Sequence, residues 1–321
     1  MTPGRLSVTA PDGVPQVRTG DDLADLLLPL VELEDGDVVL VTSKVVSKAE
    51  GRVVDGTREE HLPAETLRVV ARRGPTTIVR QRLGLVMAAA GIDASNVETG
   101  RVVLLPVDPD ASARRLRTAV RERAGRNVAV VVTDTAGRAW REGQTDIAIG
   151  AAGLVVAEQY AGRLDEHGNE LAVTLPAVAD ELAGAAELAQ GKLGGRPFAV
   201  VRGRADLVLP PDQDGPGAGA LVRAEGGDLF GWGAREAVVR ALRADPGDLA
   251  PFGTPVPAAD LAALVTAVLA LDAVPDEPAG VVRVSCPASL ARGLAALAFA
   301  HGWILEAGDA ANDALLRRAR P

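Results

Sequence analysis

Three runs of consecutive apolar, mostly β-branched residues most constrain the fold of this 321-residue chain. They are VVLVTS at 38–43, NVAVVVTDT at 127–135 and FAVVRG at 198–203. A strand with one face in water alternates apolar and polar residues, so runs without alternation predict strands buried on both faces. The stretch from Ala111 to Ala124 is rich in arginine and predicts a helix. Strands separated by helices predict a mixed α/β (α+β) fold.

Short signals around these runs predict further elements of the first part of the chain. Arg5 to Thr9 predicts a short strand, and a helix is expected to begin near Asp21 and Asp22, whose carboxylates can cap its first turn. After the third run, the segment LPPDQDGPGAGA is rich in Pro and Gly, which predicts a loop or a flexible lid. Its GPGAGA portion does not fit the dinucleotide-binding fingerprint, because no strand leads directly through it into a helix.

The C-terminal part of the chain is expected to form a separate module. A helix is expected from Arg235 to Ala244, after which PGDLAPFGTPVP is typical of a linker. Residues 257–320 are expected to alternate helix, strand, helix, strand and helix. These signals divide the chain into a domain at 1–245 and a small α/β module at 246–321.

Composition and charge exclude several classes of function. The net charge of -9 and the aromatic content of 2% argue against a nucleic-acid surface, which needs a basic stripe and stacking rings. No stretch of about twenty uncharged apolar residues occurs, and MTPGRLSVTAPDG lacks the apolar core of a signal peptide. We therefore expect a folded cytoplasmic protein that binds neither nucleic acid nor membrane.

Soft metal ligands are scarce in this sequence. The single cysteine, Cys286, cannot form an internal disulfide or a thiolate metal site, and a small buried hydrophobe is its expected role. The histidines His61, His167 and His301 are far apart, so a zinc site is not expected. Any bound metal would be a hard cation with oxygen ligands, which points to magnesium or manganese in phosphate chemistry.

A carboxylate and a hydroxyl follow the second apolar run. Asp134 and Thr135 lie where we expect the strand to end, the position at which open α/β sheets usually present ligand-binding groups. Such a pair can hold metal. The alternative, that Asp134 caps a turn toward Gly137, is about equally favoured by spacing alone.

The loop after Asp134 adds charged groups that favour the functional reading. Arg138, Arg141 and Glu142 crowd one short loop, a costly arrangement unless phosphate or carboxylate ligands pair with it. We assign Arg138 and Arg141 to an anionic substrate carboxylate or phosphate. A structural ion pair with Glu142 or Asp146 is the competing role.

A second polar turn occurs in AAAGIDASN. Asp93 follows a run of small residues, and Ser95 and Asn96 supply further oxygen and amide groups, which could build a metal-and-phosphate turn. On base rates for these residue types in loops, an ordinary Asx-turn is favoured.

Basic residues follow the first apolar run and a glycine-rich turn. Lys44, Lys48 and Arg52 could neutralise phosphates, although the sequence alone slightly favours an ordinary solvated face. QGKLGG near residues 190–195 is a weak phosphate-loop candidate, with a helix C-terminus as the alternative. The pattern G-x-x-x-x-G-K-[ST] is absent, so a P-loop is not expected.

Taken together, several long segments closely resemble the coenzyme F420-0:L-glutamate ligase family (F420:gamma-glutamyl ligase). They are VTSKVVSKAEG, GIDASN, LLPVDPD, VVTDTAGRAWREGQTDIAIGAAGL, DEHGNEL, AVADELA and AVVRG. The resemblance covers about residues 5–245 and is far more specific than any one short motif. RLGLVMAAAGIDASN is most similar to actinobacterial members, in which this ligase is the N-terminal half of a two-domain protein.

The resemblance implies a mixed α/β fold without a P-loop, working as a homodimer. It implies that GTP phosphorylates the terminal carboxylate of F420-0 and that the amine of L-glutamate attacks the acyl phosphate to form an amide. Later cycles could add glutamates through γ-links. Phosphoryl transfer needs mainly positioning and charge neutralisation, so the scarcity of histidine is no objection.

The resemblance also implies site residues. Family metal positions, for two magnesium or manganese ions, fall on Asp93, Asp134 and Thr135. Family nucleotide contacts fall on one turn, three separate residues and the Ala189 to Arg196 loop: Val14, Pro15, Gln16, Val17, Ser43, Lys48, Asn96, Gln190, Gly191, Lys192, Gly194 and Gly195. The catalytic groups expected are Asp134, Lys48, Arg138 and Arg141.

Two departures limit this transfer. Archaeal relatives carry an acidic residue in the glycine-rich loop that helps hold the second metal, whereas AQGKLGGR has none, and Glu187 or a water could substitute. In two-domain relatives the C-terminal half resembles a flavin-binding nitroreductase, and the 76 residues of 246–321 are too few for that fold. We therefore expect no flavin and no reductase activity. The tail could be an interaction or dimer-supporting module, or a vestige that packs on the ligase.

Two other functions stay open at this point. One is a catalytically silent GTP-binding or regulatory homologue, against which the retention of both aspartates and of Lys48 argues. The other is a ligase for a different carboxylate acceptor. The release of GDP and the mass of the product distinguish these from the leading hypothesis.

Overall fold

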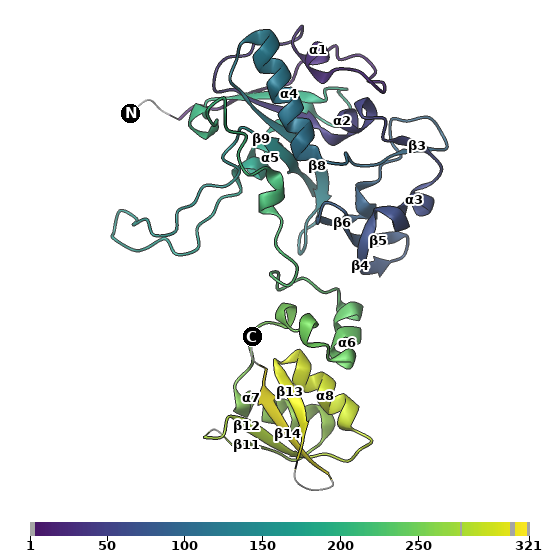
Figure 1. Cartoon of the computed structure of the whole chain (residues 1–321), viewed down its shortest axis with the longest axis vertical. Helices are drawn as coiled ribbons and strands as arrows, with labels where there is room; N and C mark the ends of the chain where they lie inside the picture. Colours follow the sequence, from purple (N-terminus) through teal and green to yellow (C-terminus); the bar gives the residue numbers. More distant parts are fainter. Residues whose placement is uncertain (1–3, 277, 309–311, 320–321) are drawn as a thin grey trace. The chain divides into compact units, whose positions relative to one another are not determined.

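The computed structural model describes residues 4–276, 278–308 and 312–319, and its contacts divide the chain into two compact units (Figure 1). Unit 1 comprises Met1–Val69 and Thr76–Val222, and unit 2 comprises Val70–Pro75 and Arg223–Pro321. Both units contain helices and sheets, which confirms the predicted mixed α/β architecture. Among the described residues, no helix has the length and apolar character needed to cross a membrane.

Unit 1 is built on a five-stranded sheet. Its strands, in spatial order, are β1 (Ser7–Thr9), β10 (Phe198–Arg202), β2 (Val38–Thr42), β8 (Ala129–Gly137) and β9 (Gln144–Ala152). Strands β2 and β8 are parallel, and the other neighbouring pairs are antiparallel. The three apolar runs therefore supply the three central strands, as predicted.

Helices cover both faces of this sheet. Helix α4 (Pro109–Ala124) packs on one face, where Val39, Val130 and Leu116 belong to one hydrophobic core. Helix α5 (Val178–Gln190) packs on the other face, where the core includes Leu40, Val131 and Leu182. Successive side chains of a strand point to opposite faces, so burial of both faces requires the unbroken apolar runs seen in the sequence.

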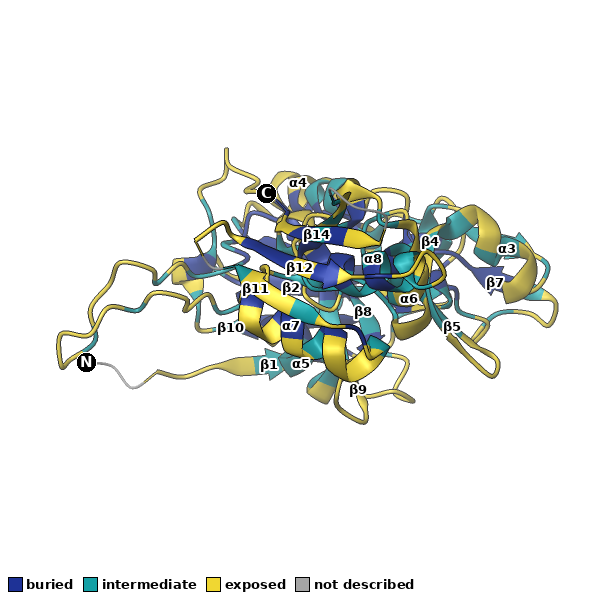
Figure 2. Ribbon diagram, turned by 90° about the horizontal axis from the view of Figure 1, so that it is seen from below, coloured by how far each residue is buried: buried dark blue, intermediate teal, exposed yellow. Residues whose placement is uncertain are grey.

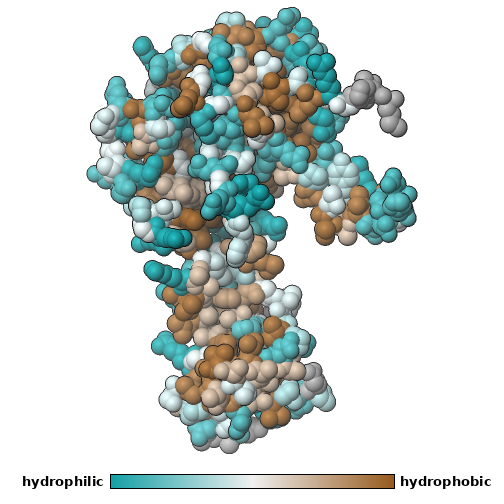
Figure 3. All heavy atoms as spheres, turned by 180° about the vertical axis from the view of Figure 1, so that it is seen from behind, coloured by the Kyte–Doolittle hydropathy of each residue, from teal (hydrophilic) through white to brown (hydrophobic). Residues whose placement is uncertain are grey.

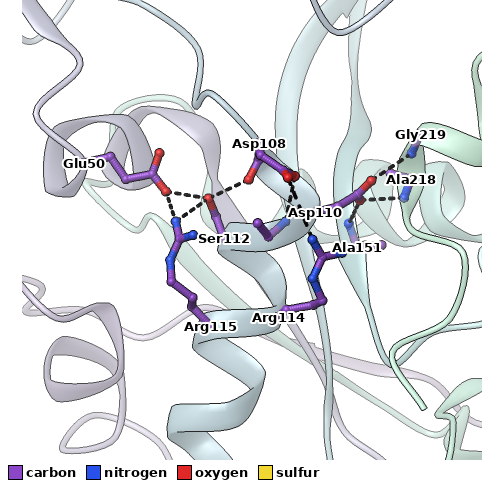
Figure 4. Close-up of polar contacts among 10 residues, drawn as sticks. Glu50, Asp108, Asp110, Ser112, Arg114, Arg115, Ala151, Ala218 and Gly219 are labelled. Carbon is purple, nitrogen blue, oxygen red and sulfur yellow. Dashed lines mark hydrogen bonds and ion pairs between the residues drawn. The ribbon is translucent and has the colours of Figure 1, made fainter.

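The N-terminus of α4 anchors the Pro- and Gly-rich loop that follows β10. The Asp110 carboxylate accepts hydrogen bonds from the backbone N–H groups of Ala151 (2.7 Å), Ala218 (2.8 Å) and Gly219 (3.3 Å), as Figure 4 shows. The buried Arg117 guanidinium donates to backbone carbonyls of the same loop. The predicted loop is confirmed, but these bonds argue against a freely moving lid.

Smaller elements complete unit 1. The Asp22 carboxylate accepts from the Ala24 N–H (2.8 Å) and caps the first helix, as predicted. The elements are α1 (Leu23–Leu27), α2 (Ser43–Ala49), α3 (Arg58–Glu65), the strand pair β3 (Val53–Asp55) and β7 (Arg101–Val103), and the three-stranded sheet β4 (Thr66–Arg73), β5 (Thr76–Gln81) and β6 (Val86–Ala88). The last part of β4, residues 70–73, is grouped with unit 2.

Unit 2 contains a four-stranded antiparallel sheet in the order β11–β12–β14–β13. Its elements are α6 (Ala234–Arg243), α7 (Ala258–Leu269), β11 (Ala273–Asp276), β12 (Val281–Ser285), α8 (Ala291–Ala300), β13 (Trp303–Ala307) and β14 (Asp313–Arg318). The prediction of alternating single helices and strands that end in a helix is wrong, because α7 and α8 are each followed by two strands.

The last element is a strand because its side chains alternate with a period of two. In β14, Ala314 and Leu316 are buried in the core around Trp303, whereas Asp313 and Arg317 are exposed (Figure 2). This alternation suits a sheet with one covered face and not an amphipathic helix. A run of six residues is also too short to distinguish the two periods reliably from sequence.

Helix α6 occurs close to the position expected from the sequence. It packs against α8 and so falls within unit 2, although the sequence grouped it with the first domain. Its Val238, Val239 and Leu242 side chains are exposed, and apolar residues also reach the surface of unit 2 in the view of Figure 3.

Candidate functional site

Three segments of unit 1 meet where β2 ends. Helix α2 begins with Ser43 directly after Thr42, the last residue of β2. The Thr42 N–H donates to the Pro197 carbonyl oxygen (3.0 Å), which holds the turn after α5 beside this point. Strand β8 pairs with β2 up to Thr133, so the residues that follow Thr133 lie next to the start of α2.

Asp134 lies inside β8 rather than at its end. The strand continues to Gly137 and pairs with β9, so the prediction that the strand ends at Asp134 is wrong. The β8–β9 register shifts between Val132 and Thr133, where Ile149 of β9 is left without a partner. Such a bulge re-aims the side chains beyond it and is common beside active sites.

The Asp134 carboxylate is held by one hydroxyl and repelled by its neighbours. The Ser43 hydroxyl donates to Asp134 Oδ1 (2.7 Å). Withdrawal from solvent raises the pKa of Asp134 to about 7, and the negative charges of Asp146 and Asp93 act in the same direction. A carboxylate in these surroundings is stabilised by any cation that binds to it.

Asp93 forms the Asx-turn that the sequence favoured, and it also binds a lysine. Its carboxylate accepts from the Ser95 N–H (2.7 Å) and hydroxyl (2.9 Å) and pairs with Lys44 Nζ (2.5 Å). Burial acts to raise the pKa of Asp93, but the bonds from Lys44 and Ser95 hold it below its ordinary value. Lys48 Nζ donates to the Asn96 carbonyl oxygen (2.8 Å). Helix α2 and the Asp93 turn are therefore joined by two lysines.

A second carboxylate cluster surrounds Thr135. The Thr135 hydroxyl donates to Asp146 Oδ1 (2.7 Å), and Lys192 Nζ donates to the same hydroxyl oxygen (2.8 Å). Lys192 also lies 2.7 Å from Glu187 Oε1 and 3.5 Å from Asp146 Oδ1. The Asp146 side chain is 4% exposed, so these partners supply the polar contacts that a buried carboxylate needs. Sequence reasoning considered Asp146 and Glu187 but did not group them with Lys192.

The glycine-rich turn is a helix C-terminus, as the alternative reading held. Helix α5 ends at Gln190, and Gly191 (φ 61°) closes it. The Gln190 side chain is 2% exposed, and its two amide atoms have no protein partner within the described part of the chain. Such orphaned buried groups are expected where a ligand or an ordered water binds.

The predicted nucleotide turn is joined to the same region. Arg196 Nε pairs with Asp12 Oδ1 (2.6 Å), which links the end of the glycine-rich turn to the segment before Val14–Val17. Within that segment Pro15 and Gln16 are exposed, whereas Val17 is buried. The predicted nucleotide-binding segments thus converge on the end of the sheet that carries Asp134.

Arg138 and Arg141 lie on the exposed turn between β8 and β9. One Arg138 nitrogen, Nη2, donates to the Glu142 carbonyl oxygen (2.7 Å) rather than to the Glu142 carboxylate. The Asp146 carboxylate is bonded to Thr135 and Lys192 instead. The recorded contacts therefore differ from the ion pairs considered as the competing role, and the turn leaves both guanidinium groups in solvent.

All lysines of the chain occur in this region. The sequence contains 34 lysines and arginines together, and its lysines are Lys44, Lys48 and Lys192 alone. Each contacts the Asp93 turn or the Thr135 cluster. A lysine is a compact charge that suits phosphate, so this concentration is a signal that residue counting could have found.

The donor set fits a metal ion that arrives with phosphate. Within residues 4–276, 278–308 and 312–319, no group of three or more His, Cys, Asp or Glu side chains is arranged to hold a metal ion. Magnesium is usually bound through one or two carboxylates together with substrate phosphates and waters, and not by an all-protein cage. Asp134, with its raised pKa and single hydroxyl partner, meets that requirement.

Comparison with known proteins shows which family the chain resembles. Residues 13–61 and 58–203 match the family model described as F420-0:Gamma-glutamyl ligase. A protein of Archaeoglobus fulgidus named coenzyme F420:L-glutamate ligase is 42% identical over 221 residues, which cover 62% of this chain and 88% of the relative.

Two further relatives with the same name have similar sequence identity and coverage. The Methanopyrus kandleri protein is 42% identical over 240 residues, covering 67% of this chain and 93% of the relative. The Haloarcula marismortui protein is 39% identical over 243 residues, which cover 65% of this chain and 95% of the relative. The matched family region contains Ser43, Asp93, Asp134, Asp146 and Lys192. This chain belongs to the F420-0:gamma-glutamyl ligase family.

Proposed function

We propose that this chain is a ligase that joins L-glutamate to coenzyme F420-0, using GTP and a divalent metal ion. Family membership and the names of the relatives support the reaction class. One observation of the structure carries the proposal: the partly buried Asp134 carboxylate bonds to the Ser43 hydroxyl and is influenced by Asp93 and Asp146, and lysines contact Asp93 and the adjacent Thr135. Such a set of groups suits a cation bound to phosphate.

The proposed reaction has two steps. A terminal carboxylate oxygen of F420-0 takes the γ-phosphoryl group of GTP, which releases GDP and gives an acyl phosphate. The amine of L-glutamate then attacks the acyl carbon, the bond from that carbon to the phosphate oxygen breaks, and phosphate and a proton leave. Both steps place several negative charges in one site, so neutralisation and positioning are the main tasks of the protein.

The side chains divide these tasks. Lys44 and Lys48 on α2 and Lys192 after α5 supply positive charge toward the phosphates. Asp134 and Asp93 would hold magnesium or manganese. When bound, such an ion would neutralise phosphate charge and align the transferred group. Arg138 and Arg141, on their exposed turn, are proposed to bind an anionic group of the substrates.

The nucleotide is proposed to bind along the segments that converge on this region. These are the Val14–Val17 turn, the start of α2 at Ser43, Asn96, and the turn after Gln190. The orphaned Gln190 amide and the Arg196–Asp12 pair support this assignment. The proposed ligase residues all lie in unit 1, so we assign the activity to that unit.

A homodimer in the cytoplasm is part of the proposal. Residues 157–177, between β9 and α5, form a long exposed arm that leaves the body of unit 1 (Figure 1). Leu164, Val173 and Leu175 on this arm are 67%, 93% and 55% exposed. Large apolar side chains on an extended arm are unfavourable in water and suit burial against a second copy.

The test is a product assay with purified protein. F420-0, L-glutamate, GTP and Mn²⁺ should give GDP together with a product heavier by one glutamate residue, detected by mass spectrometry. The Asp134→Asn variant should lose turnover while keeping the fold. GTP binding without GDP release would support a silent homologue, and turnover with another carboxylate acceptor alone would support a different ligase.

A further inference from the structure

Lys192 reaches from the turn after α5 into the carboxylate cluster. Its Nζ atom lies 2.7 Å from Glu187 Oε1, 2.8 Å from Thr135 Oγ1 and 3.5 Å from Asp146 Oδ1. These oxygens come from three separate elements, α5, β8 and β9. An ammonium group has three N–H donors, so Lys192 can direct one toward each oxygen.

The same oxygens are those that a hard divalent cation would use. Two carboxylates and a hydroxyl are typical ligands of magnesium and manganese. The Thr135 hydroxyl, however, already donates to Asp146 and accepts from Lys192, which leaves it one lone pair. A metal ion bound there would have to displace the ammonium group from its partners.

We propose that the Lys192 ammonium is the permanent cation of the Thr135 cluster and takes the place of a second metal ion. This inference rests on the proposed function. The chain then binds one divalent ion, on the Asp134 side, and not the two ions that the family resemblance implied. Lys192 acts as a positioning residue that fixes Asp146 and Glu187 without metal.

The balance of charge in the site agrees with a single ion. The site contains three lysines and four carboxylates. The lysines are Lys44, Lys48 and Lys192, and the carboxylates belong to Asp93, Asp134, Asp146 and Glu187. One divalent ion offsets the remaining negative charge and leaves positive charge for phosphate. A second divalent ion beside Lys192 would place two cations on the same oxygens, and their repulsion is strong at such short range.

The test counts bound Mn²⁺ by electron paramagnetic resonance, with a non-hydrolysable GTP analogue present. Wild-type protein should bind one Mn²⁺ per chain. Lys192→Ala should bind two, because an anionic cluster is left without its cation, and closely spaced ions should broaden the spectrum. Lys192→Arg, which keeps the charge, should bind one. Leu188→Ala, at an exposed position of α5 outside the nucleotide loop, is the matched control and should also bind one.

The possible failures are distinguishable. Two Mn²⁺ on active wild-type protein, or a single Mn²⁺ on Lys192→Ala, overturns the role of Lys192 and leaves the ligase proposal standing. No bound Mn²⁺ on any of these proteins, together with no ligation, overturns the proposed function and this inference with it. Lys192 is 58% exposed, so its replacement should not prevent folding.

Discussion

The substitution Asp134→Asn should stabilise the metal-free protein while it abolishes ligation. The folded-state pKa of Asp134 is raised from 3.8 to about 7, so the folded state binds this proton more tightly than the unfolded state. Wild-type stability therefore falls as the pH rises from about 4 to 7 and then levels off. Asparagine keeps an oxygen that can accept from Ser43 but carries no charge.

The expected magnitude follows from the two pKa values. Ionisation of Asp134 opposes folding by up to about 4 kcal/mol at pH 8 and by about 2 kcal/mol at pH 5. The advantage of the variant should therefore grow by roughly 2 kcal/mol between these pH values. The ionised Asp134 carboxylate thus lowers the stability of the folded protein until a cation binds to it, and we expect it to be kept for its role in ligation.

Urea unfolding in the presence of EDTA, at pH 5 and pH 8, measures this effect. Asp212→Asn, on the exposed loop, is the matched control and should show no such pH-dependent gain. Added Mn²⁺ should raise the stability of the wild type more than that of the variant. The reasoning is refuted if Asp134→Asn is no more stable than the wild type at pH 8, or if its advantage does not change with pH.

The remaining predictions concern a lysine, a core residue and a close backbone contact. Lys48→Ala should raise the KM for GTP about tenfold by removing one phosphate-facing charge, and an unchanged KM would refute that role. Trp303→Ala should destabilise unit 2 by about 3–5 kcal/mol in thermal unfolding, because Trp303 is fully buried, yet leave ligation unchanged. Gly150→Ala should lower stability markedly, since its Cβ would overlap the backbone of Pro109; a normal Tm would show that α4 can shift.

The buried strands of unit 1 were predictable because both faces of the sheet are covered. Val38–Thr42 and Phe198–Arg202 carry no polar interruption, and such runs have few alternatives. Short elements with one exposed face were harder. Asp313–Arg318 was assigned to a helix because six residues contain too little of either period to distinguish them.

The candidate site could be proposed from its residue types, but the pairings among its side chains could not be predicted. Asp134 was identified from the sequence, although the strand that carries it does not end there. The contact of Lys192 with Thr135 joins residues 57 positions apart, and no local pattern signals it. The Asx-turn at Asp93 was expected as the ordinary alternative, whereas its ion pair with Lys44 of α2 was not predicted.

The restriction of lysine to three positions gives the protein a chemical selectivity that most chains lack. Reagents that acylate primary amines ignore guanidinium groups, so on this chain they can modify the N-terminus and the three side chains around Asp93 and Thr135. Acylation would convert these cations into neutral amides. Bound nucleotide should shield them, and the labelling pattern then maps the occupied site without any substitution.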